Sequence, residues 1–270
     1  MGIDLSKRCI LVTGASSGIG EETARTCAQH GARVVIVSER EAELDAVAQS
    51  IRQAGGDVIP RVVDLSKPDQ VEGLIERIEA EVGHVDTLVN NAGVGLHAPV
   101  LQTRTEDMRF LFEVNFFAVA ELCKQALTAM ATRRNGRIVN VSSAAGRFGS
   151  PTISAYSATK GAVHAYTQSL RIEARVHGVL VSEVLPISVR TRFFDNVKDG
   201  KYVPHGFVLT PEGVAQDILL CIASRRPRPE ILPFRGIRLV FVLNALLPGL
   251  LVRIAGRSYA NSLQQKLKHP

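Results

Sequence analysis

A tyrosine and a lysine four positions apart, Tyr156 and Lys160 in the segment YSATK, are the residues best suited to chemistry. Residues at this spacing share one face of a helix. A phenol with a pKa of about 10 is a poor acid–base group at neutral pH, but a neighbouring ammonium favours the phenolate and lowers that pKa. The pair therefore predicts a proton donor or acceptor at a carbonyl or alcohol oxygen. Taken alone, a surface aromatic beside a solvated lysine is the more common interpretation.

Two further polar residues change that balance. Ser143 closes a predicted strand, thirteen residues before Tyr156. Its hydroxyl is suited to hydrogen-bond the same substrate oxygen and to hold the reacting carbon in place. Asn115 lies inside a predicted helix, where a hydrogen-bonded structural residue is the alternative interpretation. With both present, we predict that Asn115, Ser143, Tyr156 and Lys160 are catalytic.

A glycine-rich turn, TGASSGIG at residues 13–20, follows the first predicted strand. In this pattern Gly14 adopts a turn conformation that is closed to other residue types. Gly18 lets the backbone approach a pyrophosphate, and Gly20 allows close contact between helix and sheet. The following helix offers unpaired N–H groups and a partial positive charge to the phosphates. A plain glycine-rich turn is the alternative, but the position after the first strand of a βαβ unit favours dinucleotide binding.

Short β-branched runs alternate with helical patterns along most of the chain. Strands are predicted at residues 9–12, 33–37, 58–63, 87–89, 137–141 and 179–185, and helices from the glycine turn to about 28 and at 41–54, 67–82, 107–132 and 155–177. Apolar strands separated by helices predict an α/β fold with a doubly wound parallel sheet of Rossmann type. We expect one dinucleotide-binding and catalytic domain at 1–233, followed by an apolar, basic extension at 234–270.

The order and spacing of these motifs resemble the short-chain dehydrogenase/reductase family in its ordinary-length branch. The family patterns TGxxxGxG, NNAG (residues 90–93), a helix asparagine (Asn115), a serine (Ser143) and YxxxK follow one another within residues 8–195. The resemblance implies an NAD(P)-dependent oxidoreductase that interconverts a secondary alcohol and a ketone without a metal. It implies that Lys160 also binds the nicotinamide ribose and that Asn115 holds a water linking Lys160 to solvent. It further implies a homodimer or homotetramer packed through the helices of Asn115 and Tyr156.

The resemblance places cofactor-binding residues in several motifs along the chain. They are Gly14, Ser16, Ser17, Gly18, Ile19, Gly20, Ser38, Glu39, Arg40, Asp64, Leu65, Asn91, Ala92, Gly93, Tyr156, Lys160, Pro186 and Thr191. Ile187 departs from the family, which usually has glycine after the proline.

The choice between NAD and NADP falls on the residues that end the second strand. Family members specific for NAD usually carry an acid at the position of Ser38, and this chain does not. Glu39 is suited to accept a ribose hydroxyl and to repel a 2′-phosphate, whereas Arg40 is suited to pair with one. A solvated Glu–Arg pair is the structural alternative. The balance favours NAD.

The composition narrows the function classes. The four cysteines are widely separated, and the histidines show no metal-ligand spacing, so the sequence predicts no disulfide framework and no metal site. This cysteine usage and an N-terminus without an apolar leader predict a cytoplasmic protein. Residues 225–270 carry nine Lys and Arg against one acid, whereas the remainder has a net charge of −2. A nucleic-acid binder needs a basic face across the fold, which that distribution excludes.

The C-terminal extension contains an uncharged apolar run from Leu239 to Val252. Fourteen residues are too few to span a bilayer. Arginines at 235, 238, 253 and 257 flank the run, which is typical of a peripheral anchor on an anionic inner membrane face. An apolar helix pair covering the substrate cleft or a subunit partner is the alternative.

The segment 192–210, which usually forms the substrate lid in the family, carries Phe193, Phe194, Tyr202 and Phe207. These aromatics favour a small hydrophobic substrate (lipid-like, acyl or steroid-like), although core packing uses such residues equally well. Two other functions compete with the oxidoreductase. Epimerases and dehydratases of the wider superfamily are mostly longer chains with a larger substrate domain. A non-catalytic nucleotide sensor on the same fold has no need of Ser143, Tyr156 and Lys160 together.

Overall fold

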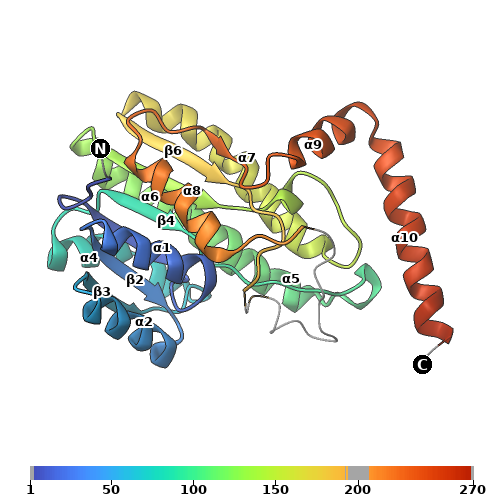
Figure 1. Cartoon of the computed structure of the whole chain (residues 1–270), viewed down its shortest axis with the longest axis horizontal. Coiled ribbons are helices and arrows are strands. Elements are labelled where there is room, and N and C mark those ends of the chain that lie inside the picture. Colours follow the sequence, from blue (N-terminus) through green and yellow to red (C-terminus); the bar gives the residue numbers. More distant parts are fainter. Residues whose placement is uncertain (1–2, 192, 194–206, 269–270) are drawn as a thin grey trace.

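The computed structural model describes residues 3–191, 193 and 207–268, with the backbone alone at 251 and 261–268 (Figure 1). Its centre is a seven-stranded, fully parallel sheet in the order β3-β2-β1-β4-β5-β6-β7. The strands are β1 (Cys9–Thr13), β2 (Arg33–Ser38), β3 (Asp57–Val62), β4 (Thr87–Asn90), β5 (Gly136–Val141), β6 (Val179–Val184) and β7 (Glu230–Ile231). This arrangement confirms the predicted doubly wound α/β fold.

The strand order reverses beside β1, and that reversal creates the binding crevice. Leu11 of β1 lies opposite Val35 of β2 on one side and Leu88 of β4 on the other. The chain first steps outward to β3 and then returns across β1 to start β4. Helices that follow the two neighbouring strands therefore leave in opposite directions, which opens a crevice at the carboxyl ends of β1 and β4.

Helices cover both faces of the sheet (Figure 1). They are α1 (Gly18–Gln29), α2 (Glu41–Gln53), α3 (Pro68–Val71), α4 (Leu74–Val82), α5 (Thr105–Phe112), α6 (Ala118–Thr132), α7 (Ser154–Val176), α8 (Pro211–Ala223), α9 (Ile237–Leu246) and α10 (Pro248–Lys268). Short 3₁₀ turns form at Val100–Gln102 (η1) and Ala144–Gly146 (η3).

Alternate residues of each strand point into two separate apolar cores. Ile10 of β1 packs with residues of α1, α2 and α8, such as Ile218, on one face. Leu11 packs with residues of α4, α6 and α7, such as Leu122 and Leu170, on the other face. The central strands β1, β4 and β5 are buried along their whole length and are mostly apolar, which explains why the sequence pattern identified the sheet.

The predicted helix at 67–82 is interrupted, so its prediction as one continuous helix is wrong, whereas the predicted helix at 107–132 is helical throughout. The 67–82 segment divides into α3 and α4 because Gly73 has a φ of +64°, a left-handed conformation. The 107–132 segment contains the π-helical turn η2 (Glu113–Phe117) between α5 and α6. Both α8 and the short strand β7 were missed by the sequence pattern.

The C-terminal helices α9 and α10 form an arm that projects from the body (Figure 1). Among the described residues, no single helix is long and apolar enough to cross a membrane. Ile237–Leu246 and Pro248–Ala260 meet the length and composition requirement only as a pair, which is bent by 108°. The arm touches the body through Phe241, whose ring centroid lies 6.2 Å from that of Phe148 and 4.8 Å from the guanidinium carbon of Arg147.

Candidate functional site

Most of the site residues predicted from the sequence converge on one cavity of about 730 Å³ at the carboxyl ends of the strands. The wall is formed by the turn between β1 and α1, by residues following β2, β4, β5 and β6, and by α7. The predicted residues that line it are Gly14, Ser16, Ser17, Gly18, Ile19, Ser38, Glu39, Arg40, Leu65, Asn91, Ala92, Gly93, Ser143, Tyr156, Lys160, Pro186 and Thr191. Gly20, Asp64 and Asn115 lie next to this lining without forming part of it.

The glycine turn is locked against the end of β4. Gly14 has a φ of +65°, and a Cβ there would lie 2.6 Å from the Cα of Ala92. The side-chain amide of Asn91 donates hydrogen bonds to the carbonyl oxygens of Thr13 (3.0 Å) and Gly14 (3.2 Å). The turn therefore keeps a fixed shape at the N-terminus of α1, where the backbone N–H groups are placed to bind phosphate.

Tyr156, Lys160 and Ser143 meet at the opposite end of the cavity. Tyr156 and Lys160 share one face of α7, and Lys160 Nζ lies 5.9 Å from the centroid of the Tyr156 ring. Ser143 follows β5, and its Oγ accepts a hydrogen bond from the N–H of Ala145 (3.1 Å). The structure thus brings together the three residues proposed from sequence spacing.

Lys160 is a nearly buried cation. Its side chain donates a hydrogen bond to the carbonyl oxygen of Val141 (3.1 Å), and the residue is only 4% exposed. Burial lowers the pKa of Lys160 to about 8, and the nearby Glu183 carboxylate opposes that shift. Because loss of water disfavours the charged form, the ammonium and the neutral amine are close in free energy at physiological pH.

Asn115 joins the loop after β4 to α7. It is fully buried in η2, where its amide accepts from the N–H of Val94 (2.8 Å) and donates to the carbonyl oxygen of Val94 (2.9 Å) and to Oγ1 of Thr159 (3.0 Å). A Cβ on Gly93 would lie 3.2 Å from Asn115 Oδ1 and 3.4 Å from Lys160 Nζ. π-Helical turns concentrate at functional sites, and this one presents Asn115 beside Lys160.

The residues after β2 form the far end of the cavity. The Ser38 hydroxyl donates to the Ser16 hydroxyl (2.9 Å) and accepts from the N–H of Arg40 (3.2 Å). Glu39 and Arg40 both line the space, and Glu39 is exposed. Asp64 instead forms a local turn, because its carboxylate accepts from the N–H of Ser66 (2.8 Å). The assignment of Asp64 to cofactor binding stays a prediction.

The end of the cavity near Tyr156 has an apolar wall. It contains Leu96, Phe110, Leu111, Val114, Phe148, Ile153, Ile187 and Phe193. The ring of Phe193 lies 5.7 Å from that of Tyr156, and Ile187, the departure from the family pattern, faces the cavity. Phe207 instead stacks on Phe234 at 4.9 Å and is largely exposed. Phe194 and Tyr202 lie outside the described residues.

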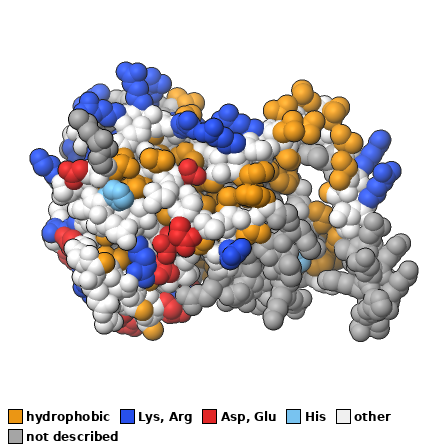
Figure 2. Space-filling model, in the orientation of Figure 1, with side chains coloured by type: hydrophobic (Ala, Val, Ile, Leu, Met, Phe, Trp, Pro, Cys, Tyr) orange, Lys and Arg blue, Asp and Glu red, His pale blue; other side chains and the backbone are white. Residues whose placement is uncertain are grey.

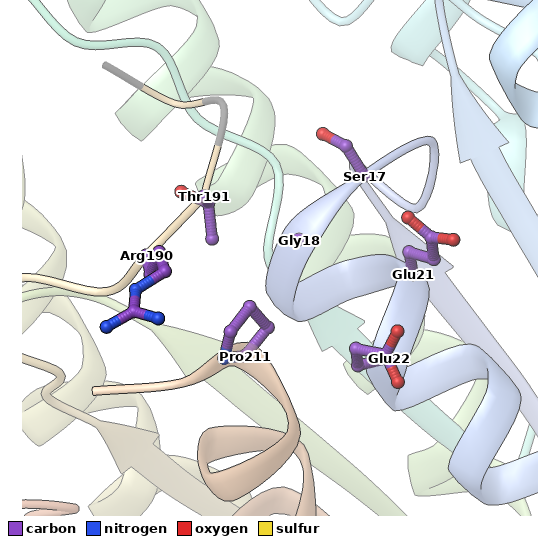
Figure 3. Close-up of a pocket in the computed structure, with 7 residues that line it drawn as sticks. All are labelled: Ser17, Gly18, Glu21, Glu22, Arg190, Thr191 and Pro211. Atoms are coloured by element: carbon purple, nitrogen blue, oxygen red, sulfur yellow. The ribbon is translucent and has the colours of Figure 1, made fainter. Parts of the chain in front are cut away.

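A smaller pocket of about 350 Å³ adjoins the glycine turn on its outer side (Figure 3). Arg190 and Thr191 form one side of it, and Glu21 and Glu22 on α1 lie across from them. Ser17, Gly18 and Thr191 line both spaces. We therefore interpret the small pocket as the outer opening of the same cleft.

Sequence reasoning missed a group of polar residues behind the wall. Ser142 and His164, which the sequence analysis did not assign to the site, both hydrogen-bond the fully buried carboxylate of Glu183. A signal was present, because a single acid inside the apolar run VLVSEVL must find partners when the strand is buried. The apolar wall had no such signal, since its members are divided between the helical segment that contains Phe110, Leu111 and Val114 and several loops without regular spacing.

Comparisons with known proteins identify the family. A family model described as short chain dehydrogenase matches residues 8–201. A relative named fatty acyl-CoA reductase, from Acinetobacter baylyi, is 34% identical over 81% of this chain and 74% of its own length. The chain belongs to the short-chain dehydrogenase/reductase family, whose members are NAD(P)-dependent oxidoreductases.

Two solved structures show the same fold with different nicotinamide cofactors. A metagenomic short-chain oxidoreductase in complex with NADP is 31% identical, with a TM-score of 0.73 over 84% of this chain and 97% of its own. A short-chain dehydrogenase/reductase from Burkholderia phymatum in complex with NAD is 27% identical, with a TM-score of 0.82 over 93% of this chain and 96% of its own. The family therefore accounts for a nicotinamide cofactor without selecting between the two forms.

Replacing Lys160 with Met should stabilise the fold at neutral pH and progressively less in alkali. The usual lysine pKa of 10.5 falls to about 8 in the fold. Between these pH values the unfolded chain binds more protons than the native chain, so the stability of the natural protein rises with pH. The gain in the free energy of unfolding from Lys160→Met should therefore shrink by about 3 kcal/mol between these two pH values. Urea unfolding at several pH values measures it.

The exposed residue Lys124 provides the control for this measurement. Its side chain on α6 is 73% exposed, so its ammonium stays in water in both the folded and the unfolded state. Lys124→Met should show no comparable trend. A stability difference for Lys160→Met that stays constant with pH would contradict the buried-cation interpretation.

Proposed function

We propose that this protein catalyses reversible hydride transfer between a nicotinamide cofactor and a secondary alcohol or ketone. The observation that carries the proposal is the meeting of Ser143, Tyr156 and Lys160 in one cavity whose other end is the glycine turn. The cofactor supplies the hydride when it is bound. All the residues named below act by binding, orienting or moving a proton.

The cavity has the donors that a dinucleotide requires. The N-terminus of α1 at Ser17 to Ile19 is suited to hold the pyrophosphate, because these residues line the cavity where the first N–H groups of the helix have no partner within it. Lys160 is suited to hold the nicotinamide ribose, and Thr191 the carboxamide. Asn91 and Ala92 line the middle of the cleft, against the glycine turn.

The proton step belongs to Tyr156. In ketone reduction its hydroxyl donates a proton to the developing alkoxide, and in alcohol oxidation its phenolate accepts one. The Lys160 ammonium favours the phenolate by its charge, and the Ser143 hydroxyl fixes the substrate oxygen. Asn115 holds the loop and the helix that present these groups.

A hydrophobic substrate of acyl, lipid-like or steroid-like type fits the apolar wall. Phe110, Phe148 and Phe193 contribute three aromatic rings to that wall. Burial of such a substrate would supply binding free energy in proportion to the apolar area removed from water. The name of the A. baylyi relative, fatty acyl-CoA reductase, agrees with this class of substrate.

Tyr156→Phe should reduce turnover of a ketone panel roughly 10²- to 10⁴-fold while leaving cofactor affinity nearly unchanged, because it removes only the proton donor. The assay is the oxidation of NADH or NADPH with medium- and long-chain ketones. Tyr166→Phe is the matched control, since Tyr166 is on the same helix and its hydroxyl donates to the carbonyl oxygen of Ala120 (3.2 Å), away from the cavity. Full activity in Tyr156→Phe would rule out the proposed chemistry.

We further propose that the enzyme prefers NAD(H), because the Glu39 carboxylate would repel a 2′-phosphate and accept a ribose hydroxyl. Glu39→Gln should then tighten NADPH binding roughly tenfold relative to NADH, followed by nicotinamide fluorescence. Glu41→Gln, two residues along in the first turn of α2, is the control. Tighter binding of NADPH by the natural protein would reverse the assignment and give the phosphate to Arg40.

The arm suggests where the enzyme works. We propose that residues 234–257 contact a membrane peripherally from the cytoplasm, as an extension of the catalytic unit formed by residues 1–233. Leu239, Val242, Leu246, Leu247, Leu250, Val252 and Ile254 are exposed, and the arm's apolar side chains cluster at the end of the molecule away from the sheet (Figure 2). Arg253 and Arg257 are exposed beside them, a combination suited to an anionic leaflet.

Leu246→Glu in the full-length protein should lower binding to vesicles at least tenfold, because it removes one leucine that the proposed contact buries in the membrane and adds a negative charge. The measurement is flotation with vesicles of phosphatidylcholine containing an equal share of phosphatidylglycerol. Leu220→Glu on α8 makes the same change at a residue 58% exposed on the body and should bind like the natural protein. Equal flotation of both variants would contradict the proposed membrane contact of the arm. A lower molecular mass of Leu246→Glu in light scattering would instead assign the arm to a contact between subunits.

We propose a homodimer or homotetramer packed through α6 and α7, the helices next to Asn115 and bearing Tyr156. Phe117, Ile172 and Val176 are exposed apolar residues on or beside these helices. Burial of such side chains between copies of the chain would be favourable.

A further inference from the structure

A buried carboxylate lies directly behind the candidate active site. Glu183 in β6 is fully buried, and both of its oxygens are occupied. The Ser142 hydroxyl donates to Oε1 at 2.5 Å, and His164 Nδ1 lies 2.8 Å from Oε2, where it donates as well. Glu183 is not one of the described residues that line the cavity. Any influence of Glu183 on the reaction must therefore pass through its neighbours.

The first of these neighbours leads to Ser143. Ser142 follows Val141 and precedes Ser143 in the sequence. The carbonyl oxygen of Val141 accepts a hydrogen bond from Lys160 Nζ (3.1 Å). The end of β5 is thus held from α7 by Lys160 and from β6 by Glu183. A buried carboxylate is costly unless it is paired, so its position is fixed by these contacts. The two together determine where the strand presents Ser143.

The second neighbour leads along α7. Tyr156, Lys160 and His164 occur at successive four-residue intervals and form one stripe on the helix. The field of the Glu183 carboxylate acts on Lys160, where it raises the lysine pKa against the effect of burial. Glu183 therefore favours the ammonium form that Tyr156 requires.

Other charged and polar groups lie near Glu183 and Lys160. Glu230 on β7 places a carboxylate oxygen within 4.8 Å of the Glu183 and His164 ligand atoms. Its charge is balanced by Arg147, at 3.2 Å. From η2 the neighbour of Lys160 is the uncharged amide of Asn115. Arg171 of α7 donates to the carbonyl oxygens of Val181 and Pro229.

We propose that Glu183 is a positioning residue for the reaction, which fixes the strand end that carries Ser143 and, through its contact with His164, holds a negative charge one helical turn from Lys160. The assignment of roles to Ser143 and Lys160 rests on the proposed function. Ser142 and His164 serve this role by holding the carboxylate in place.

The test follows NADH affinity from pH 6 to pH 10 by fluorescence in the full-length protein. Affinity should fall roughly tenfold as Lys160 loses its proton. Glu183→Gln keeps the size of the side chain but removes its charge, so the midpoint of that fall should move lower by about one pH unit. Glu183→Asp should restore the natural midpoint. Glu230→Gln, the same substitution on the adjacent strand, should leave the midpoint in place. An unchanged midpoint in Glu183→Gln, or an equal shift in Glu230→Gln, would overturn the proposal.

A second measurement requires no cofactor. Unfolding by urea at pH 7 is compared for the natural protein, Glu183→Gln, Lys160→Met and the double variant. The two substitutions should be non-additive by at least about fivefold in the unfolding equilibrium constant, because each removes a charge that acts on the other. Additive effects would overturn the electrostatic coupling of Glu183 with Lys160. If the protein does not bind NADH but the two substitutions are non-additive in unfolding, the result would count against the proposed function and would support the electrostatic coupling of Glu183 with Lys160.

Discussion

The buried ammonium of Lys160 is the constraint on which the rest of the site depends. To reach the carbonyl oxygen of Val141, α7 must pack closely on the end of β5. Gly146 permits that approach, since a Cβ there would lie 2.6 Å from the carbonyl carbon of Lys160. A cation removed from water needs compensation from its surroundings. The carbonyl of Val141 and the carboxylate of Glu183 provide it, and both belong to strands whose ends already form the cavity.

The topology brings residues from distant segments to that cation. Parallel strands end at the same edge of the sheet, so the turn after β1, the NNAG segment after β4 and Ser143 after β5 become neighbours. Asn115 then joins the NNAG loop to α7 through Val94 and Thr159. The cofactor end and the proton-transfer end of the cavity are consequently parts of one hydrogen-bonded framework.

The sequence predicted the features that follow from regular spacing. Apolar strands identified the sheet, and the four-residue step from Tyr156 to Lys160 placed both on one helix face. The break at Gly73 was not predicted, because a helix break of one residue leaves the apolar periodicity almost intact. The π-helical turn around Asn115 was not predicted either, because the helix continues through it. The partners of Glu183 were likewise beyond prediction, because Ser142 and His164 meet it only through the register of β5 with β6 and the packing of α7.

The attachment of the arm links the surface of the protein to its substrate wall. Phe241 of α9 contacts both Phe148, which lines the cavity, and Arg147, which pairs with Glu230. Glu230 in turn lies beside the carboxylate that holds the strand of Ser143. A displacement of α9 therefore acts first on the apolar wall and on the charges behind it, whereas the glycine turn lies at the other end of the cavity. On this geometry, docking of the arm should affect the binding of substrate more than the binding of cofactor.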